Sequence, residues 1–215
     1  MLYSLQGDDD NYLQTLDDYT REDSQHFSEA FAELQRAMSE TDGDILGVVY
    51  EELGQSSDHF GQHFTPHSLS DAKAAMFIEE NSENEQYTVM DPASGSGRLL
   101  MSASKINPEG VFYGIDKDAT CAKMTALNLT FFNVDGYAIH GDSLKMDYHQ
   151  VWKTAHTALG GEVRELDETE WSDPYQENLG EESEASVSTD TDDIDVDFEE
   201  LRETDLDDFL DASSK

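Results

Sequence analysis

The chain has 215 residues, with 49 acidic and 12 basic side chains, and its formal net charge at pH 7 is −37. This length predicts one domain with appendages, and a single cysteine, Cys121, excludes an internal disulfide. No apolar run approaches the ~20 residues of a membrane span, and the first ten residues lack the basic and apolar regions of a signal peptide. We therefore expect a cytoplasmic protein that does not enter a membrane.

The acidic side chains are spread along the whole chain. Residues 1–160 contain 27 acidic and 9 basic residues, so an acidic tail on an ordinary domain does not account for the balance. A chain this acidic and this poor in lysine is typical of a very salty cytosol, where a Debye length of ~3 Å screens the self-repulsion. We expect a halophilic protein.

Residues 1–54 predict a helical N-terminal region. Residues 1–22 are polar and acidic, and we expect them to be loosely ordered. Apolar side chains spaced three and four apart predict helices over 23–38 and 45–53, the second with Asp44 as its N-cap. The side chains expected to face inward are Phe27, Ala30, Phe31, Leu34, Met38, Ile45, Val48, Val49 and Leu53.

A histidine-rich stretch follows, in which His59, His63 and His67 lie four residues apart. On a continuous helix this spacing would place all three on one face, as metal ligands require. Gly61 and Pro66 interrupt such a helix, so we favour an interpretation without a metal site.

Thr65 and Pro66 predict the start of a helix, with Thr65 as the N-cap and Pro66 at the first helical position. We expect this helix to continue to Glu80. Its N-terminus has unpaired backbone N–H groups and favours an anion such as a carboxylate. The side chains expected to be buried are Leu69, Ala72, Met76 and Phe77.

The next segment has the order strand, glycine loop, helix. Tyr87–Met90 is rich in strand-forming residues, and Asp91 ends the run. Gly95 and Gly97 permit a positive φ and a close approach of the backbone to a ligand, and a helix is expected from Arg98. Such a loop directs N–H groups at a ligand, and the Asp91 carboxylate suits a positive charge. One Gly-x-Gly alone is more often a structural turn.

Two further strands are expected over 110–116 and 136–142, with a helix between them. They end in Asp116 and Asp142. Because right-handed crossovers bring the carboxyl ends of parallel strands to one edge of a sheet, we expect both aspartates near Asp91. A single aspartate at a strand end is usually a cap or turn residue, but three beside a glycine loop predict a pocket.

Four segments carry a more specific signal: Gly61-Gln-His-Phe-Thr-Pro66, Asp91-Pro-Ala-Ser-Gly-Ser-Gly-Arg-Leu-Leu100, Tyr113-Gly-Ile-Asp116 and Gly141-Asp-Ser-Leu144. In this order and spacing they resemble the cofactor-binding half of adenine-specific N6 DNA methyltransferases, in particular the modification subunits of type I restriction systems. The resemblance covers about residues 44–145. It implies an α/β fold, with a Rossmann-like parallel sheet of the S-adenosylmethionine-dependent methyltransferase type over residues 55–166. The sheet could be truncated.

The resemblance also implies a cofactor, partners and site residues. The cofactor is S-adenosylmethionine, the substrate is DNA, and a specificity or other partner subunit is expected. The implied cofactor-binding residues are Thr65 and Pro66 for the methionine carboxylate, Asp91 for the ammonium, Gly95 and Gly97 for backbone approach, Asp116 for the ribose hydroxyls, Asp142 for the adenine amino group, and Leu144 or Ile115 for the adenine ring.

One part of the family's pattern is not matched. A tetrapeptide (Asp/Asn/Ser)-Pro-Pro-(Tyr/Phe) normally follows the third acid at the end of an apolar strand and holds the flipped-out adenine. The nearest match is Ser172-Asp-Pro-Tyr175, so Ser172, Pro174 and Tyr175 are candidate catalytic residues, although an acidic loop is the favoured interpretation. Residues 145–159 instead predict a helix. Its apolar side would contain Val151, Trp152, Ala155 and Leu159.

Residues 167–215 are dense in acidic residues and poor in apolar ones, so we expect a disordered tail. Three functions stay open: an S-adenosylmethionine-dependent, adenine-specific DNA methyltransferase of a restriction-modification or related system, a catalytically silent cofactor-binding module that acts with a partner subunit, and a dinucleotide-binding oxidoreductase. Thr65-Pro66 and the lack of a third spaced glycine after Gly97 argue against the oxidoreductase. The missing tetrapeptide leaves open whether this chain is active alone.

Overall fold

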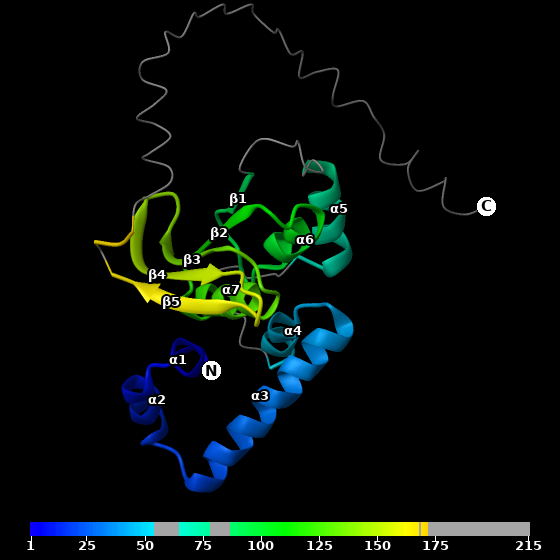
Figure 1. Ribbon diagram of the computed structural model, residues 1–215. Coiled ribbons are helices and arrows are strands. Elements are labelled where there is room, and N and C mark those ends of the chain that lie inside the picture. Colours follow the sequence, from blue (N-terminus) through cyan, green and yellow to red (C-terminus); the bar gives the residue numbers. More distant parts are fainter. Residues whose placement is uncertain (54–64, 78–86, 168, 172–215) are drawn as a thin grey trace, which may run out of the picture. The chain divides into compact units, whose positions relative to one another are not determined.

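The computed structural model describes residues 1–53, 65–77, 87–167 and 169–171, which form a mixed α/β fold (Figure 1). The described strands form one sheet in the order β1-β2-β3-β4-β5. They are β1 Thr88–Asp91, β2 Val111–Asp116, β3 Gly136–Asp142, β4 Asp147–Ala155 and β5 Glu162–Leu166. The described helices are α1 Leu2–Gln6, α2 Asp9–Leu16, α3 Arg21–Thr41, α4 Ile45–Glu52, α5 His67–Phe77, α6 Arg98–Ile106 and α7 Ala119–Phe131.

The first half of the sheet is parallel, as the sequence predicts. β1 pairs with β2 and β2 with β3, and α6 and α7 are the connections. Because both crossovers step in the same direction across the sheet, right-handed connections place α6 and α7 on the same face. Phe112 of β2 is fully buried there, in one cluster with Leu100 of α6 and Leu129 of α7. The predicted Rossmann-like α/β fold is confirmed.

The predicted helix over 145–159 is wrong, because Asp147–Ala155 form the strand β4. This strand pairs antiparallel with β3 and β5, and its register places Trp152 opposite Ala138. Val151 and Trp152 are adjacent in sequence and both buried, Val151 on the face away from α7 and Trp152 on the face toward it. A strand buried on two faces lacks a clean period of two, so its apolar spacing can resemble that of a helix.

The N-terminal residues are more ordered than the sequence predicts. Residues 1–22 contain α1 and α2, and Leu2 and Leu5 of α1 pack against the buried cluster around Trp152. The long helix α3 begins at a capping box on Thr20 and leads from α2 to α4 (Figure 1). This apolar packing offsets part of the entropy cost of ordering residues 1–22, which their polar composition alone does not offset.

Only part of the predicted inward faces of α3 and α4 is buried. Leu34 and Met38 of α3 are buried, while Phe27, Val49 and Leu53 are exposed. The predicted N-cap of α4 is confirmed, since Asp44 accepts a hydrogen bond from the backbone N–H of Gly47. Gly54, which the sequence predicts as the C-cap of this helix, lies outside the described residues.

Helix α5 begins at His67, one residue later than predicted, and the Pro66 carbonyl accepts from the N–H of Ser70 at 3.0 Å. Its buried residues are Ser70 and Ala74. Leu69, Ala72 and Met76, predicted to be buried, are exposed because α5 packs through small side chains against α6. The side chain of Phe77 and the residues from 78 to 86 lie outside the described part of the chain.

The face of the sheet opposite α6 and α7 carries an apolar and aromatic cluster. The rings of Tyr113 and Tyr137 stack with their centroids 4.9 Å apart, and Trp171 lies against Tyr137 at 5.4 Å. All described members of this cluster come from strands or from the segment after β5, so no described helix contributes to it.

Candidate functional site

The glycine loop lies where β1 and β2 end. Gly95 and Gly97 adopt φ values of 56° and 86°, which a residue with a Cβ rarely takes. The Gly95 N–H donates to Asp116 Oδ2 at 2.8 Å, and the Ser94 N–H donates to the Ile115 carbonyl at 2.9 Å. The loop is therefore tied to the end of β2 and leads directly into α6.

Three of the predicted residues line one hollow beside this loop. They are Thr65, Asp91 and Gly95, and Ala93, Ser94, Ser96, Arg98 and Leu99 complete its lining. The hollow has a volume of about 60 Å³. Sites for drug-sized ligands measure several hundred Å³, so this hollow accommodates only a few non-hydrogen atoms, such as one end of a larger ligand.

Two carboxylates at this edge have raised pKa values. Burial raises the pKa of Asp91, and the N–H of Ala93 and the charge of Lys73 counteract only part of this effect. Burial likewise raises the pKa of Asp116, although the N–H groups of Asp118 and Gly95 both donate to it. A cationic ligand beside Asp91 would offset the cost of burying its charge.

Asp142 lies at the end of β3, as predicted, but its carboxylate is occupied by lysines. Lys117 Nζ and Lys145 Nζ lie 2.9 and 3.4 Å from its Oδ2. The hydrogen bond from Lys117 is the main reason that the pKa of Asp142 falls to about 2. The neighbouring Ser143 Oγ donates to the Pro92 carbonyl at 2.9 Å, which joins the ends of β3 and β1. Leu144, on the same loop, is 95% exposed.

The sequence did not reveal a buried polar cluster directly behind the loop. It consists of Asp44, Ser96, Arg98 and Asn128, each with less than a tenth of its surface exposed. The pattern identified Asp44 only as an N-cap and Arg98 only as the start of a helix. No local signal could show that residues 54 positions apart in the chain form an ion pair.

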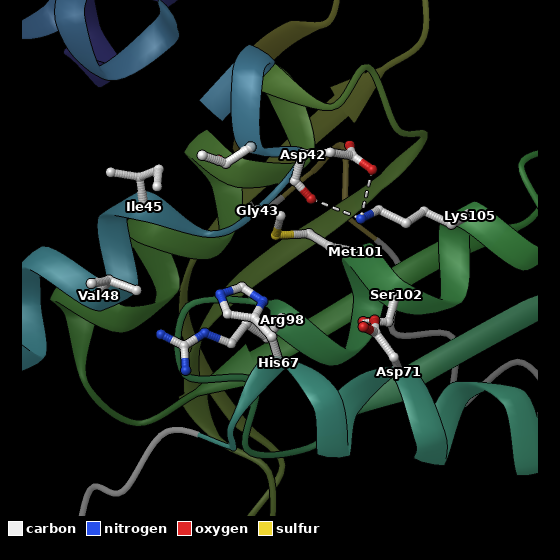
Figure 2. A pocket seen from close by; sticks show the side chains of 11 residues that line it. Asp42, Gly43, Ile45, Val48, His67, Asp71, Arg98, Met101, Ser102 and Lys105 are labelled. Atoms are coloured by element: carbon white, nitrogen blue, oxygen red, sulfur yellow. Dashed lines mark hydrogen bonds and ion pairs between the residues drawn. The ribbon is translucent and has the colours of Figure 1, made fainter. Parts of the chain in front are cut away.

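A second cavity, of about 450 Å³, opens on the other side of Arg98, between the α3–α4 corner and helices α5 and α6 (Figure 2). Its polar side chains contact one another: Lys105 Nζ lies 2.9 Å from Asp42 Oδ2, and Ser102 Oγ donates to Asp71 Oδ1 at 2.7 Å. His67, the only described member of the three spaced histidines, also lines it.

Several predicted features lie outside the described residues. These are the candidates Ser172, Pro174 and Tyr175, and the histidines His59 and His63. Within the described part, no group of His, Cys, Asp or Glu side chains could hold a metal ion. The described helices include none that is long and apolar enough to span a membrane. Cys121 is fully buried, and burial raises the pKa of its thiol.

The fold and this site define an α/β protein with a glycine loop and acidic strand ends at the edge where such sheets bind nucleotide-type ligands. A model of the family described as N-6 DNA Methylase matches residues 41–167, more than half of the chain. The chain therefore belongs to the N-6 DNA methylase family. The matched residues include the loop, Thr65 and all three aspartates. No curated protein and no solved structure matches the chain.

Proposed function

We propose that the protein is an S-adenosylmethionine-dependent DNA methyltransferase that acts on N6 of adenine in a restriction-modification or related system. The observation that carries the proposal is the hollow shared by Thr65, Asp91 and Gly95. Thr65 is 26 positions before Asp91 in the chain, while Asp91 and Gly95 belong to the same strand-and-loop segment, and the family match covers all three residues.

The residues of the hollow suit the amino-acid end of that cofactor. The buried Asp91 carboxylate would bind the methionine ammonium, which would compensate the burial that raises its pKa. The methionine carboxylate would lie near Thr65 and Pro66, where α5 begins and the helix dipole favours an anion. The small volume of the hollow matches one end of the cofactor rather than the whole molecule.

The nucleoside end would extend along the ends of β2 and β3. Asp116 accepts one backbone N–H on each oxygen and retains lone pairs for the ribose hydroxyls. Asp142 would accept from the adenine amino group only by sharing its carboxylate with Lys117 or Lys145. Ile115 is 1% exposed, so the exposed Leu144 is the better candidate for the contact with the adenine ring.

S-adenosylmethionine supplies a methyl group on a positively charged sulfur. The target amine of adenine is a poor nucleophile, because its lone pair is delocalised into the ring. Transfer therefore needs acceptors for the amine hydrogens and an aromatic side chain that holds the base in line. The four prolines of the sequence, at positions 66, 92, 108 and 174, are all isolated, so the Pro-Pro of the family's tetrapeptide is absent.

We accordingly expect the chain by itself to bind the cofactor and to transfer little or no methyl group to DNA. A partner chain would supply the missing groups. The proposed setting is a cytoplasm of high salt concentration. The proposed organisation is an N-terminal helical region over 1–54, a cofactor-binding domain over 55–166 and an acidic tail over 167–215.

The test is methyl transfer from tritiated cofactor to DNA in molar potassium chloride. Labelled DNA from the isolated chain, lost in Tyr175→Ala, would show that Ser172-Asp-Pro-Tyr175 works and that the chain is a self-sufficient enzyme. Labelling only after a partner subunit is added would support the proposal. A wild-type chain that binds no cofactor would refute it.

A further inference from the structure

A buried ion pair lies directly behind the glycine loop. Asp44, the N-cap of α4, has no exposed surface, and Arg98, the first residue of α6, is 6% exposed. Arg98 Nε donates to Asp44 Oδ2 at 2.8 Å. Burying two charges costs desolvation energy that their attraction barely offsets. Proteins in which apolar residues replace a buried ion pair are often as stable as the original. Stability alone is therefore a poor explanation for this pair.

The Asp44 carboxylate joins three parts of the chain. Its Oδ1 accepts from the Gly47 N–H at 2.7 Å and from Asn128 Nδ2 at 2.8 Å, and its Oδ2 accepts from Ser96 Oγ as well as from Arg98. Asn128 Nδ2 also donates to the Ser96 carbonyl at 2.7 Å. All lone pairs of the carboxylate are engaged, so the back of the glycine loop is fixed to α4 and α7.

Arg98 extends this network to the second cofactor-binding segment. Its Nη1 donates to the Thr65 carbonyl at 3.0 Å, and its Nη2 lies 3.1 Å from Glu51 Oε2. Thr65 is therefore held in place by the first residue of α6, which directly follows the glycine loop and lines the same hollow. The guanidinium is balanced by Asp44 and Glu51, so its charge is already neutralised within the protein.

We infer that the Asp44–Arg98 pair positions Thr65 and the glycine loop relative to each other, and so sets the affinity for the amino-acid end of the cofactor. This inference rests on the proposed function. It makes α4 part of the cofactor site, although Asp44 has no exposed surface and cannot touch a ligand. Asp44 is a positioning residue that acts through Arg98 and Ser96.

A second ion pair between the same regions provides a matched control. Lys105 Nζ of α6 lies 2.9 Å from Asp42 Oδ2, next to α4, and Figure 2 shows this pair in the lining of the second cavity. Both side chains are substantially exposed, and neither lines the hollow beside the glycine loop. Lys105→Gln therefore removes an ion pair between α6 and the N-terminal region without disturbing the network behind the loop.

The experiment measures calorimetric affinities in molar potassium chloride for S-adenosylhomocysteine and for 5′-methylthioadenosine, which lacks the amino-acid end. We expect Asp44→Asn to weaken binding of S-adenosylhomocysteine about tenfold or more, since small misplacements of binding groups are costly, and to leave 5′-methylthioadenosine within about twofold. Lys105→Gln should change neither affinity.

A measurement of folding and a second variant keep the outcomes separate. A circular dichroism melt establishes that Asp44→Asn is folded at the assay temperature. If it is not, Glu51→Gln, which removes only the more exposed partner of Arg98, serves as the test variant. Equal losses for both ligands, or no loss for either, would overturn the inference while the wild-type affinity still supports the proposed function. A wild type that binds neither ligand would overturn the function itself.

Discussion

Gly47 of α4 offers a test of how tightly the buried network is packed. A Cβ at this position would lie 2.0 Å from Asp44 Oδ2, 2.6 Å from Ser96 Oγ and 2.9 Å from Arg98 Nη2. Glycine to alanine within a helix ordinarily stabilises by up to ~1 kcal/mol. Here the methyl group has to displace the Asp44 carboxylate, and breaking a buried ion pair costs ~3–5 kcal/mol. The steric term wins, and we expect Gly47→Ala to lower the free energy of unfolding by ~2–4 kcal/mol.

The assay is urea unfolding followed by circular dichroism in molar potassium chloride, because urea leaves the ionic strength unchanged. Gly43 supplies the control, since a Cβ there would meet its nearest neighbours at 3.6–3.7 Å, an ordinary contact distance. Gly43→Ala should change the free energy of unfolding by no more than ~0.5 kcal/mol. A Gly47→Ala variant as stable as the wild type would refute the tight packing of Asp44 against α4 and the glycine loop.

Three further predictions concern pH, salt and the core. Burial raises the pKa of Asp91, and only the ionised carboxylate binds an ammonium, so cofactor affinity should fall as pH decreases. The fall should begin at a higher pH than it would for an ordinary aspartate. Calorimetry across a pH series should find this fall in the wild type and not in Asp91→Asn. The net charge of −37 should make the fold loosen at low salt, which an unchanged circular dichroism melt between low and molar salt would contradict. Trp152 is buried, and Trp152→Ala should lower the free energy of unfolding by ~3–5 kcal/mol. Leu159 is exposed, and Leu159→Ala should lower it by under ~0.5 kcal/mol. Similar values for the two variants would refute the assignment of β4 to the core.

The parallel half of the fold could be predicted because its signals are local. Asp91, Asp116 and Asp142 each end a strand at the predicted residue, and Gly95 and Gly97 occupy a loop that needs a positive φ. Strand ends and glycine loops depend on backbone conformation at single positions, so the sequence specifies them directly.

The antiparallel strands could not be predicted in the same way. Val151, Trp152, Ala155 and Leu159 are spaced as on a helix, and only pairing with β3 and β5 selects the strand. Tertiary pairing of this kind overrides local spacing. Leu159 is fully exposed in the turn between β4 and β5, which a helical pattern would have placed in the core.

In the candidate site, too, features with local signals could be predicted and features that depend on tertiary contacts could not. Thr65, Asp91 and Gly95, predicted from motifs, line one hollow, whereas the roles of Asp44 and Arg98 depend on a contact between distant segments. The ion pairs between Asp142 and the two lysines were not predicted either. Lys117 lies in the loop after β2, so its contact with Asp142 depends on how the strands pair.

The most direct test of the proposed function is calorimetric titration of S-adenosylmethionine into the chain in molar potassium chloride, with Asp91→Ala as the comparison. We predict a saturable binding heat for the wild type and a loss of ~1.5–3 kcal/mol of binding free energy in the variant, the range for a lost hydrogen bond to a charged group. Absence of binding by the wild type, or equal affinities for the two proteins, would contradict the assignment of the hollow at Asp91 as the cofactor site.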